Sequence, residues 1–138
     1  MKFKIWIMIV KSFLIIMLFI ATPVNADQGR DRHCQAITYM GLKMYEFLGI
    51  GGNEINRAFG LNVVKNLANE YDRQGGNGKG ESTRQFVTTA FEKNIEKEVV
   101  VEAIYFSCST GRTIYVDRLP LCNRLPEGKI PACLNLYF

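Results

Sequence analysis

The fold class depends on the stretch from Glu81 to Cys108, which reads ESTRQFVTTAFEKNIEKEVVVEAIYFSC. Its apolar residues recur at the spacing that is typical of one face of an α-helix. This face consists of Phe86, Ala90, Phe91, Ile95 and Val99. Acidic and hydroxyl side chains are favourable at a helix start, so the helix is predicted to begin at Glu81 or Ser82.

The second half of this stretch allows two interpretations. The β-branched residues Val99–Val101 favour a strand, which would pair with Thr113–Val116. Continued as a helix, the stretch keeps Ala103 and Phe106 on the face already described. We favour the helix, which predicts an all-α fold: a small three- to four-helix domain with an irregular, disulfide-pinned C-terminal tail. The alternative is an α+β fold with a C-terminal hairpin at 99–116.

Two more helices are predicted before this stretch. Residues 33–48 carry apolar side chains at helical spacing, and three glycines follow closely and end the helix. Asn53 is a favourable N-cap for the next helix. The apolar stripe of this second helix consists of Ile55, Ala58, Phe59, Val63, Leu67 and Tyr71. The polar residues 27–32 before the first helix are expected to be frayed.

The remaining segments are expected to be less regular. Four glycines lie within Gln74–Gly80, which predicts a flexible surface loop. From Ser109 onward the apolar residues lose helical spacing and three prolines interrupt the chain, so we expect an irregular tail with at most a short strand at Thr113–Val116. The alternation of apolar and polar residues over Leu134–Phe138 predicts a segment that packs back on the helices.

The first residues have the features of a secretory signal peptide. Lys2 and Lys4 give a positive start, Lys11 interrupts the apolar residues that follow, and Phe13–Ala21 is an unbroken apolar run. Val24 and Ala26 are small enough for the cleavage positions. The alternative, an uncleaved membrane anchor, is disfavoured because the uninterrupted apolar run is far shorter than the roughly 20 residues that span a bilayer. We therefore expect residues 1–26 to be removed and residues 27–138 to form a single helical, disulfide-stabilised domain.

The charge of the chain lies largely in that first segment. The 17 basic and 13 acidic residues give a net charge of +4, and residues 1–26 hold three of the lysines and no acid. Without these three, 14 basic residues face 13 acidic ones, a net charge of +1. Such a chain has no overall field for nucleic acid or an anionic membrane, and we expect neither as a partner.

The four cysteines are Cys34, Cys108, Cys122 and Cys133. An even number of cysteines behind a signal peptide predicts two disulfides and an oxidising compartment. Of the three pairings, we favour Cys34–Cys108, which would link two helices, and Cys122–Cys133, which would close a short loop. The predicted location is the periplasm or the extracellular medium.

Most motifs of cofactor or metal chemistry are missing. The segment Asn77–Ser82 has a Gly-Lys pair, but Gly80 follows the lysine where a phosphate-binding loop needs serine or threonine. The single histidine, His33, is next to Cys34 on a helix, where the two side chains diverge, and no Cys-x-x-Cys occurs. We expect no cofactor, no metal and no catalytic residue.

Two loops are candidates for recognising a partner. Asn77 and Lys79 lie in the glycine-rich loop, and Arg124, Glu127 and Lys129 lie between the two last cysteines. A loop closed by a disulfide loses less conformational entropy when it binds. The partners expected are another exported protein or a second copy of the chain in a homodimer.

The architecture is similar to that of periplasmic inhibitors and of immunity proteins that protect bacteria from exported toxins. The expected function is that of an exported, non-enzymatic protein-binding module, of the kind that inhibits a cell-wall-directed enzyme or toxin. Two alternatives stay open. One is a small hydrolase that uses Glu98 and Glu102, four positions apart on one helical face, as acid and base. The other is a structural subunit of an envelope assembly.

Overall fold

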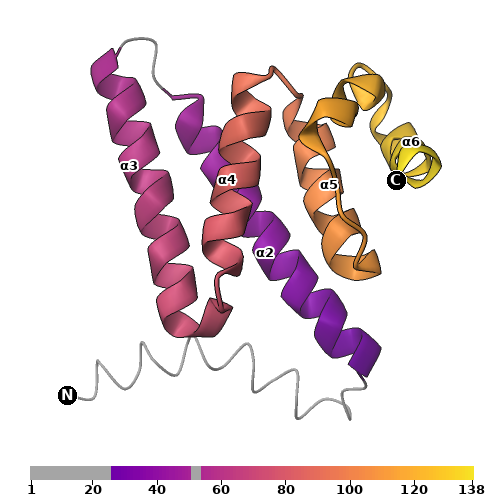
Figure 1. The fold of residues 1–138 in the computed structure, drawn as a ribbon, viewed down its shortest axis with the longest axis horizontal. Coiled ribbons are helices and arrows are strands. Elements are labelled where there is room, and N and C mark those ends of the chain that lie inside the picture. Colours follow the sequence, from indigo (N-terminus) through magenta and orange to yellow (C-terminus); the bar gives the residue numbers. More distant parts are fainter. Residues whose placement is uncertain (1–25, 51–53) are drawn as a thin grey trace. The chain divides into compact units, whose positions relative to one another are not determined.

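The computed structural model describes residues 26–50 and 54–138, and every regular element within them is a helix (Figure 1). The all-α prediction is therefore confirmed. The hairpin alternative is wrong, because Lys97–Thr110 form helix α5 and Thr113–Val116 form no strand. The predicted signal peptide lies almost entirely outside the described residues. Within the described part, no helix is both long and apolar enough to cross a lipid bilayer.

The chain divides into two compact units, Met1–Arg32 and His33–Phe138, and the second contains all the features considered below. Helix α2 spans Ala26–Leu48, so it begins before His33, and the backbone of residues 27–32, which are expected to be frayed, is helical in the full chain. The side chains of α2 that are buried in the core are Cys34, Ile37, Met40, Met44 and Leu48.

Helix α3 spans Glu54–Tyr71 and packs mainly against α4, as Figure 1 shows. Only part of the predicted stripe is buried, since Leu67 and Tyr71 are half-buried against the core while Ile55 and Phe59 are 80% and 60% exposed. The buried positions are the small residues Gly60, Val64 and Ala68. A β-carbon at Gly60 would lie 2.7 Å from the Phe47 carbonyl oxygen, so the chain approaches too closely there for a larger side chain.

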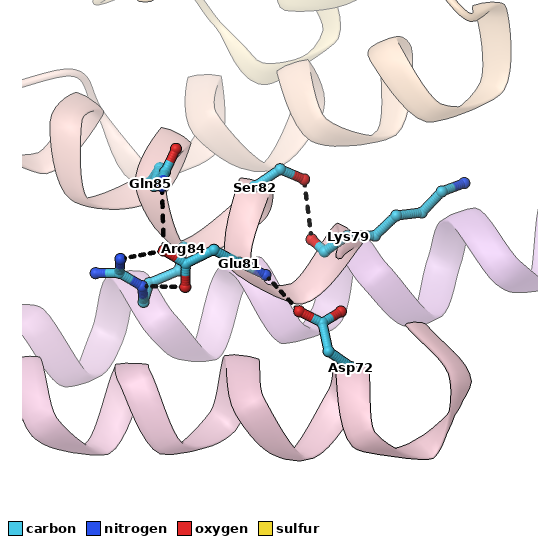
Figure 2. Close-up of polar contacts among 6 residues, drawn as sticks. All are labelled: Asp72, Lys79, Glu81, Ser82, Arg84 and Gln85. Carbon is cyan, nitrogen blue, oxygen red and sulfur yellow. Dashed lines mark hydrogen bonds and ion pairs between the residues drawn. The ribbon is translucent and has the colours of Figure 1, made fainter. Parts of the chain in front are cut away.

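The turn between α3 and α4 is partly helical and is held by hydrogen bonds, whereas the sequence predicted a loop over Gln74–Gly80. It consists of the short π-helix η1, Asp72–Gly76, and the residues that lead into α4, Lys79–Glu92. The Asp72 carboxylate accepts hydrogen bonds from the backbone N–H groups of Gly80 and Glu81 at 2.8 and 3.0 Å, and Figure 2 shows the bond from Glu81. These are amides of the first turn of α4, which have no partner inside the helix. We refer to residues 72–81 as the α3–α4 turn.

The stretch Glu81–Cys108 contains a break that was not predicted. Helix α4 ends at Glu92 and α5 begins at Lys97, so the expected single helix is two. Asn94 adopts a φ of 59°, a left-handed conformation that asparagine tolerates better than most residues. After this turn Ile95 is fully buried and its N–H donates to the Ala90 carbonyl oxygen at 3.0 Å. We refer to residues 93–96 as the elbow.

The C-terminal tail is more regular than predicted. It contains the 3-10 helices η2, Val116–Cys122, and η3, Glu127–Lys129, and the α-helix α6, Ile130–Tyr137. Pro131 is compatible with α6 because it lies in the first turn, where a missing N–H leaves no bond unmade. Ile130 and Leu134 face the core.

The two disulfides are the pairs favoured from the sequence. Cys34–Cys108 joins α2 to α5 with a Cα–Cα distance of 5.5 Å, and Cys122–Cys133 joins η2 to α6 with 5.9 Å. The core between them is a single apolar cluster. From α4 and α5 it takes Val87, Ala90, Val99, Val100, Ala103 and Ile104, while Phe86 and Phe91 are half-buried at its edge.

Candidate functional site

The strongest candidate site is the segment between the last two cysteines, residues 122–133, which we call the cystine loop. Its two ends, Cys122 and Cys133, are buried, as is Ile130. Between them, all the residues from Arg124 to Lys129 are exposed. The disulfide fixes the ends of the loop, and the side chains of its middle are free to contact another molecule.

Two residues of the cystine loop attach it to the elbow. The Asn123 amide oxygen accepts the Glu96 backbone N–H at 3.0 Å, and its amide nitrogen donates to the Asn94 carbonyl oxygen at 3.3 Å. In return, the Glu96 carboxylate accepts the backbone N–H of Arg124 at 2.6 Å. Arg124 has a φ of 64°, so the chain turns sharply there. Asn123 thus caps the start of α5 and anchors the loop with the same side chain.

An open groove of about 1020 Å³ lies between the cystine loop, the end of α2 and the start of α5. The residues that line it are Tyr45, Glu46, Gly49, Ile50, Glu96, Lys97, Glu98, Arg124, Leu125, Pro126 and Glu127. Tyr45, one of these lining residues, is held by two contacts. Its hydroxyl donates to the Ile95 carbonyl oxygen at 2.5 Å, and its ring packs edge-on against Phe91 with the ring centres 5.1 Å apart.

The groove carries more acidic than basic side chains. Burial raises the pKa of Tyr45 above its ordinary value, and the charges of Glu98 and Glu96 raise it further. On the neighbouring face of α5, burial raises the pKa of Glu102, with a smaller contribution from Glu127. The groove and its border therefore have a negative potential, interrupted by the cations of Lys97 and Arg124.

The predicted partner-binding residues fall into two places. Arg124 and Glu127 line the groove, and Lys129 is exposed at the end of the same loop. Asn77 and Lys79 lie in the α3–α4 turn and do not contribute to the groove. The sequence prediction missed the roles of Asn123 and Glu96. The one feature of the sequence that could have indicated the role of Asn123 is its position directly after a cysteine, where its side chain is held close to the rest of the fold and can cap a helix.

The alternatives find little support in the geometry. Glu98 lines the groove, while Glu102 lies outside its lining and is half-buried. His33 is exposed, and its neighbour Cys34 is fully buried in a disulfide. Within the described ranges, 26–50 and 54–138, no cluster of His, Cys, Asp or Glu side chains is arranged to hold a metal ion.

The chain matches no protein-family model, no curated protein and no solved structure.

Proposed function

We propose that this chain is an exported, non-enzymatic protein-binding module that inhibits a cell-wall-directed enzyme or toxin by covering its cleft with the cystine loop. The observation that carries the proposal is the exposed run from Arg124 to Lys129 on a backbone held by the Cys122–Cys133 disulfide and by Asn123. A fixed loop can enter a cleft without being ordered first, and this lowers the entropic cost of binding.

The side chains of the loop suit this purpose. Arg124 offers a planar group of hydrogen-bond donors, Leu125 and Pro126 offer apolar surface, and Glu127 and Lys129 add charges at the border. Arginine is enriched among the residues that dominate binding energy at protein interfaces. The two disulfides are compatible with an oxidising compartment, which supports export as part of the proposal.

The test is photo-crosslinking from the loop in the cells that make the protein. The full chain carrying a photoreactive side chain at Leu125 is expected to form a 1:1 adduct with one exported enzyme, and the same side chain at Asn69 on α3 should not. The purified chain should then inhibit that enzyme. Arg124→Glu/Lys129→Glu should abolish inhibition, while Arg57→Glu/Lys65→Glu, which changes the charge equally on α3, should leave it intact.

Two results would contradict the proposal. One is an adduct with several components of a large envelope complex, which would support a structural subunit. The other is hydrolysis of cell-wall polymer by the pure chain itself. The raised pKa of Glu102 beside Glu127 is the one observation that favours such a hydrolase, since a protonated carboxyl is the form that a general acid needs. Loss of that hydrolysis in Glu102→Gln would establish it.

A further inference from the structure

A second pocket lies away from the cystine loop, between the start of α4, the end of α5 and the residues that follow α5. Its volume is about 450 Å³, within the range of roughly 300–1,000 Å³ that is usual for small-molecule sites. Lys79 and Arg112 are its basic residues, and we call it the Lys79–Arg112 pocket. The function proposed above makes no use of it.

The floor of this pocket is apolar and firmly packed. It includes Ile37 from α2 and Ala103 and Ile104 from α5, all of which are buried. Gly41 brings α2 so close that a β-carbon there would lie 2.3 Å from the terminal methyl of Ile104. The half-buried Phe86 adds an aromatic edge. The floor therefore suits the hydrocarbon part of a ligand better than a polar group.

The rim of the pocket is basic and carries hydroxyl groups. Lys79 and Arg112 come from separate segments, and Ser82, Thr83, Ser107 and Thr113 supply hydroxyls. Among the residues that the structure describes, no acidic one lines it, in contrast to the groove beside the cystine loop, which has four glutamates. Two positive charges at the mouth of an apolar floor favour a ligand with one anionic end.

The acids nearest to Lys79 in sequence are already occupied. Asp72 accepts the backbone N–H groups of Gly80 and Glu81, and the Glu81 carboxylate binds Arg84 and Gln85. In Figure 2 the Lys79 side chain extends away from the side chains of Asp72, Glu81, Arg84 and Gln85. Its ammonium charge is therefore not cancelled by its neighbours in the α3–α4 turn.

Arg112 is held in place by neutral groups. Its guanidinium lies 5.6 Å from the centre of the Phe106 ring, and one nitrogen donates to the Asn135 amide oxygen at 3.3 Å. Its carbonyl oxygen accepts the Ser107 hydroxyl at 2.8 Å, which fixes the backbone. The guanidinium is thus positioned by contacts that leave its charge for a ligand.

We propose that the Lys79–Arg112 pocket binds a small amphipathic anion, with a carboxylate or phosphate head group between Lys79 and Arg112 and a short apolar chain on the floor. Both head groups accept the same charge-assisted hydrogen bonds, so the pocket selects for charge and for an apolar chain of limited length.

The test is titration of the full chain, with both disulfides formed, against four probes that share one apolar chain. Octanoate and octyl phosphate carry the anion, and 1-octanol and octylammonium are its neutral and cationic counterparts. Calorimetry should detect binding of at least one anion and neither counterpart, and the tighter anion identifies the head group. In amide NMR spectra the shifts should concentrate at Ser82, Ser107 and Thr113.

Charge removal supplies the control. Lys79→Gln and Arg112→Gln should each weaken the affinity for the bound anion about tenfold, the usual value of one charge-assisted hydrogen bond. Lys65→Gln/Arg118→Gln removes two positive charges elsewhere and should leave the affinity unchanged. Equal binding of 1-octanol, binding that is insensitive to both pocket variants, or no binding of either anion would overturn the proposal. Unchanged thermal unfolding of the variants excludes loss of fold.

Discussion

The α3–α4 turn and the cystine loop are both short and polar, but they are fixed by opposite means. In the turn, Gly76 and Gly80 are buried and Asp72 binds backbone amides, so the backbone itself fills the space. In the cystine loop a covalent bond and the amide of Asn123 hold the ends. Among the residues of this turn, Lys79 lines the Lys79–Arg112 pocket, while the Asp72 carboxylate is occupied by the backbone. A loop closed at its ends keeps its middle side chains for contact with a partner.

The largest effect is expected from removing the bond that closes the cystine loop. Cys122→Ala/Cys133→Ala should lower the free energy of unfolding by about 3 kcal/mol, since a disulfide between residues 11 positions apart restricts the unfolded chain by about that much. Denaturant unfolding measures the change. A loss below about 1 kcal/mol would mean that the hydrogen bonds to the elbow fix the loop without the disulfide.

The two regions should differ sharply in their need for glycine. A β-carbon at Gly80 would lie 2.4 Å from the Ala68 carbonyl oxygen, so Gly80→Ala should cost about 2 kcal/mol through overpacking. Gly128 in the cystine loop has open space around it and no positive φ, so Gly128→Ala should change stability by less than about 0.5 kcal/mol. Thermal unfolding of both variants tests this difference. Equal losses of stability in the two variants would contradict it.

The polar caps of the two regions should contribute equally but respond differently to conservative changes. Asp72→Ala and Asn123→Ala should each lower the free energy of unfolding by about 1 kcal/mol, the usual value of a helix cap. Asp72→Asn keeps an acceptor oxygen and should recover part of the loss. Asn123→Asp keeps the acceptor but loses the donor to Asn94 and places a carboxylate beside Glu96, so denaturant unfolding should show no recovery.

The smallest effects are on the pH dependence of stability, and Glu81 and Glu102 contribute to it with opposite signs. The hydrogen bond from Arg84 lowers the pKa of Glu81 to about 2, so its contribution to stability is present above its ordinary pKa of 4.5 and is lost as the pH falls towards 2. Burial raises the pKa of Glu102, so the folded chain binds the extra proton and stability declines as the pH rises above 4.5.

Unfolding measured across this pH range separates the two groups. The difference between the parent chain and Glu81→Gln should shrink as the pH falls from 4.5 to 2. The difference between the parent chain and Glu102→Gln should grow in favour of the variant as the pH rises above 4.5. The same sign for both variants would contradict this account.

The sequence predicted the helices α2, α3 and α4 and both disulfides, but only part of the buried face of α3. A periodicity argument gives most weight to large apolar residues, and these, Ile55 and Phe59, lie outside. The buried face is made of small residues because of a close backbone approach at Gly60. Such an approach depends on two segments that are distant in the sequence, so the residue pattern of either segment alone does not predict it.

The elbow and the tail were missed for a similar reason. Asn94 has an unremarkable helix propensity, and the residue that binds its carbonyl oxygen at this left-handed turn, Asn123, lies 29 positions away in the sequence. For the candidate site, the sequence predicted the exposed Arg124 and Glu127. The groove they line depends on the end of α2, whose position no local pattern could predict.

The two ends of α5 are attached in different ways. Near its last turn, Cys108 is covalently bound to α2, and at its start Glu96 is held by the hydrogen bonds of Asn123 and Arg124. Mechanical tension on the cystine loop would therefore break the hydrogen bonds to Glu96 before the disulfide between α5 and α2. The loop would detach from the elbow while α5 stays joined to α2, so that a partner pulling on the loop extends it without extracting the helix.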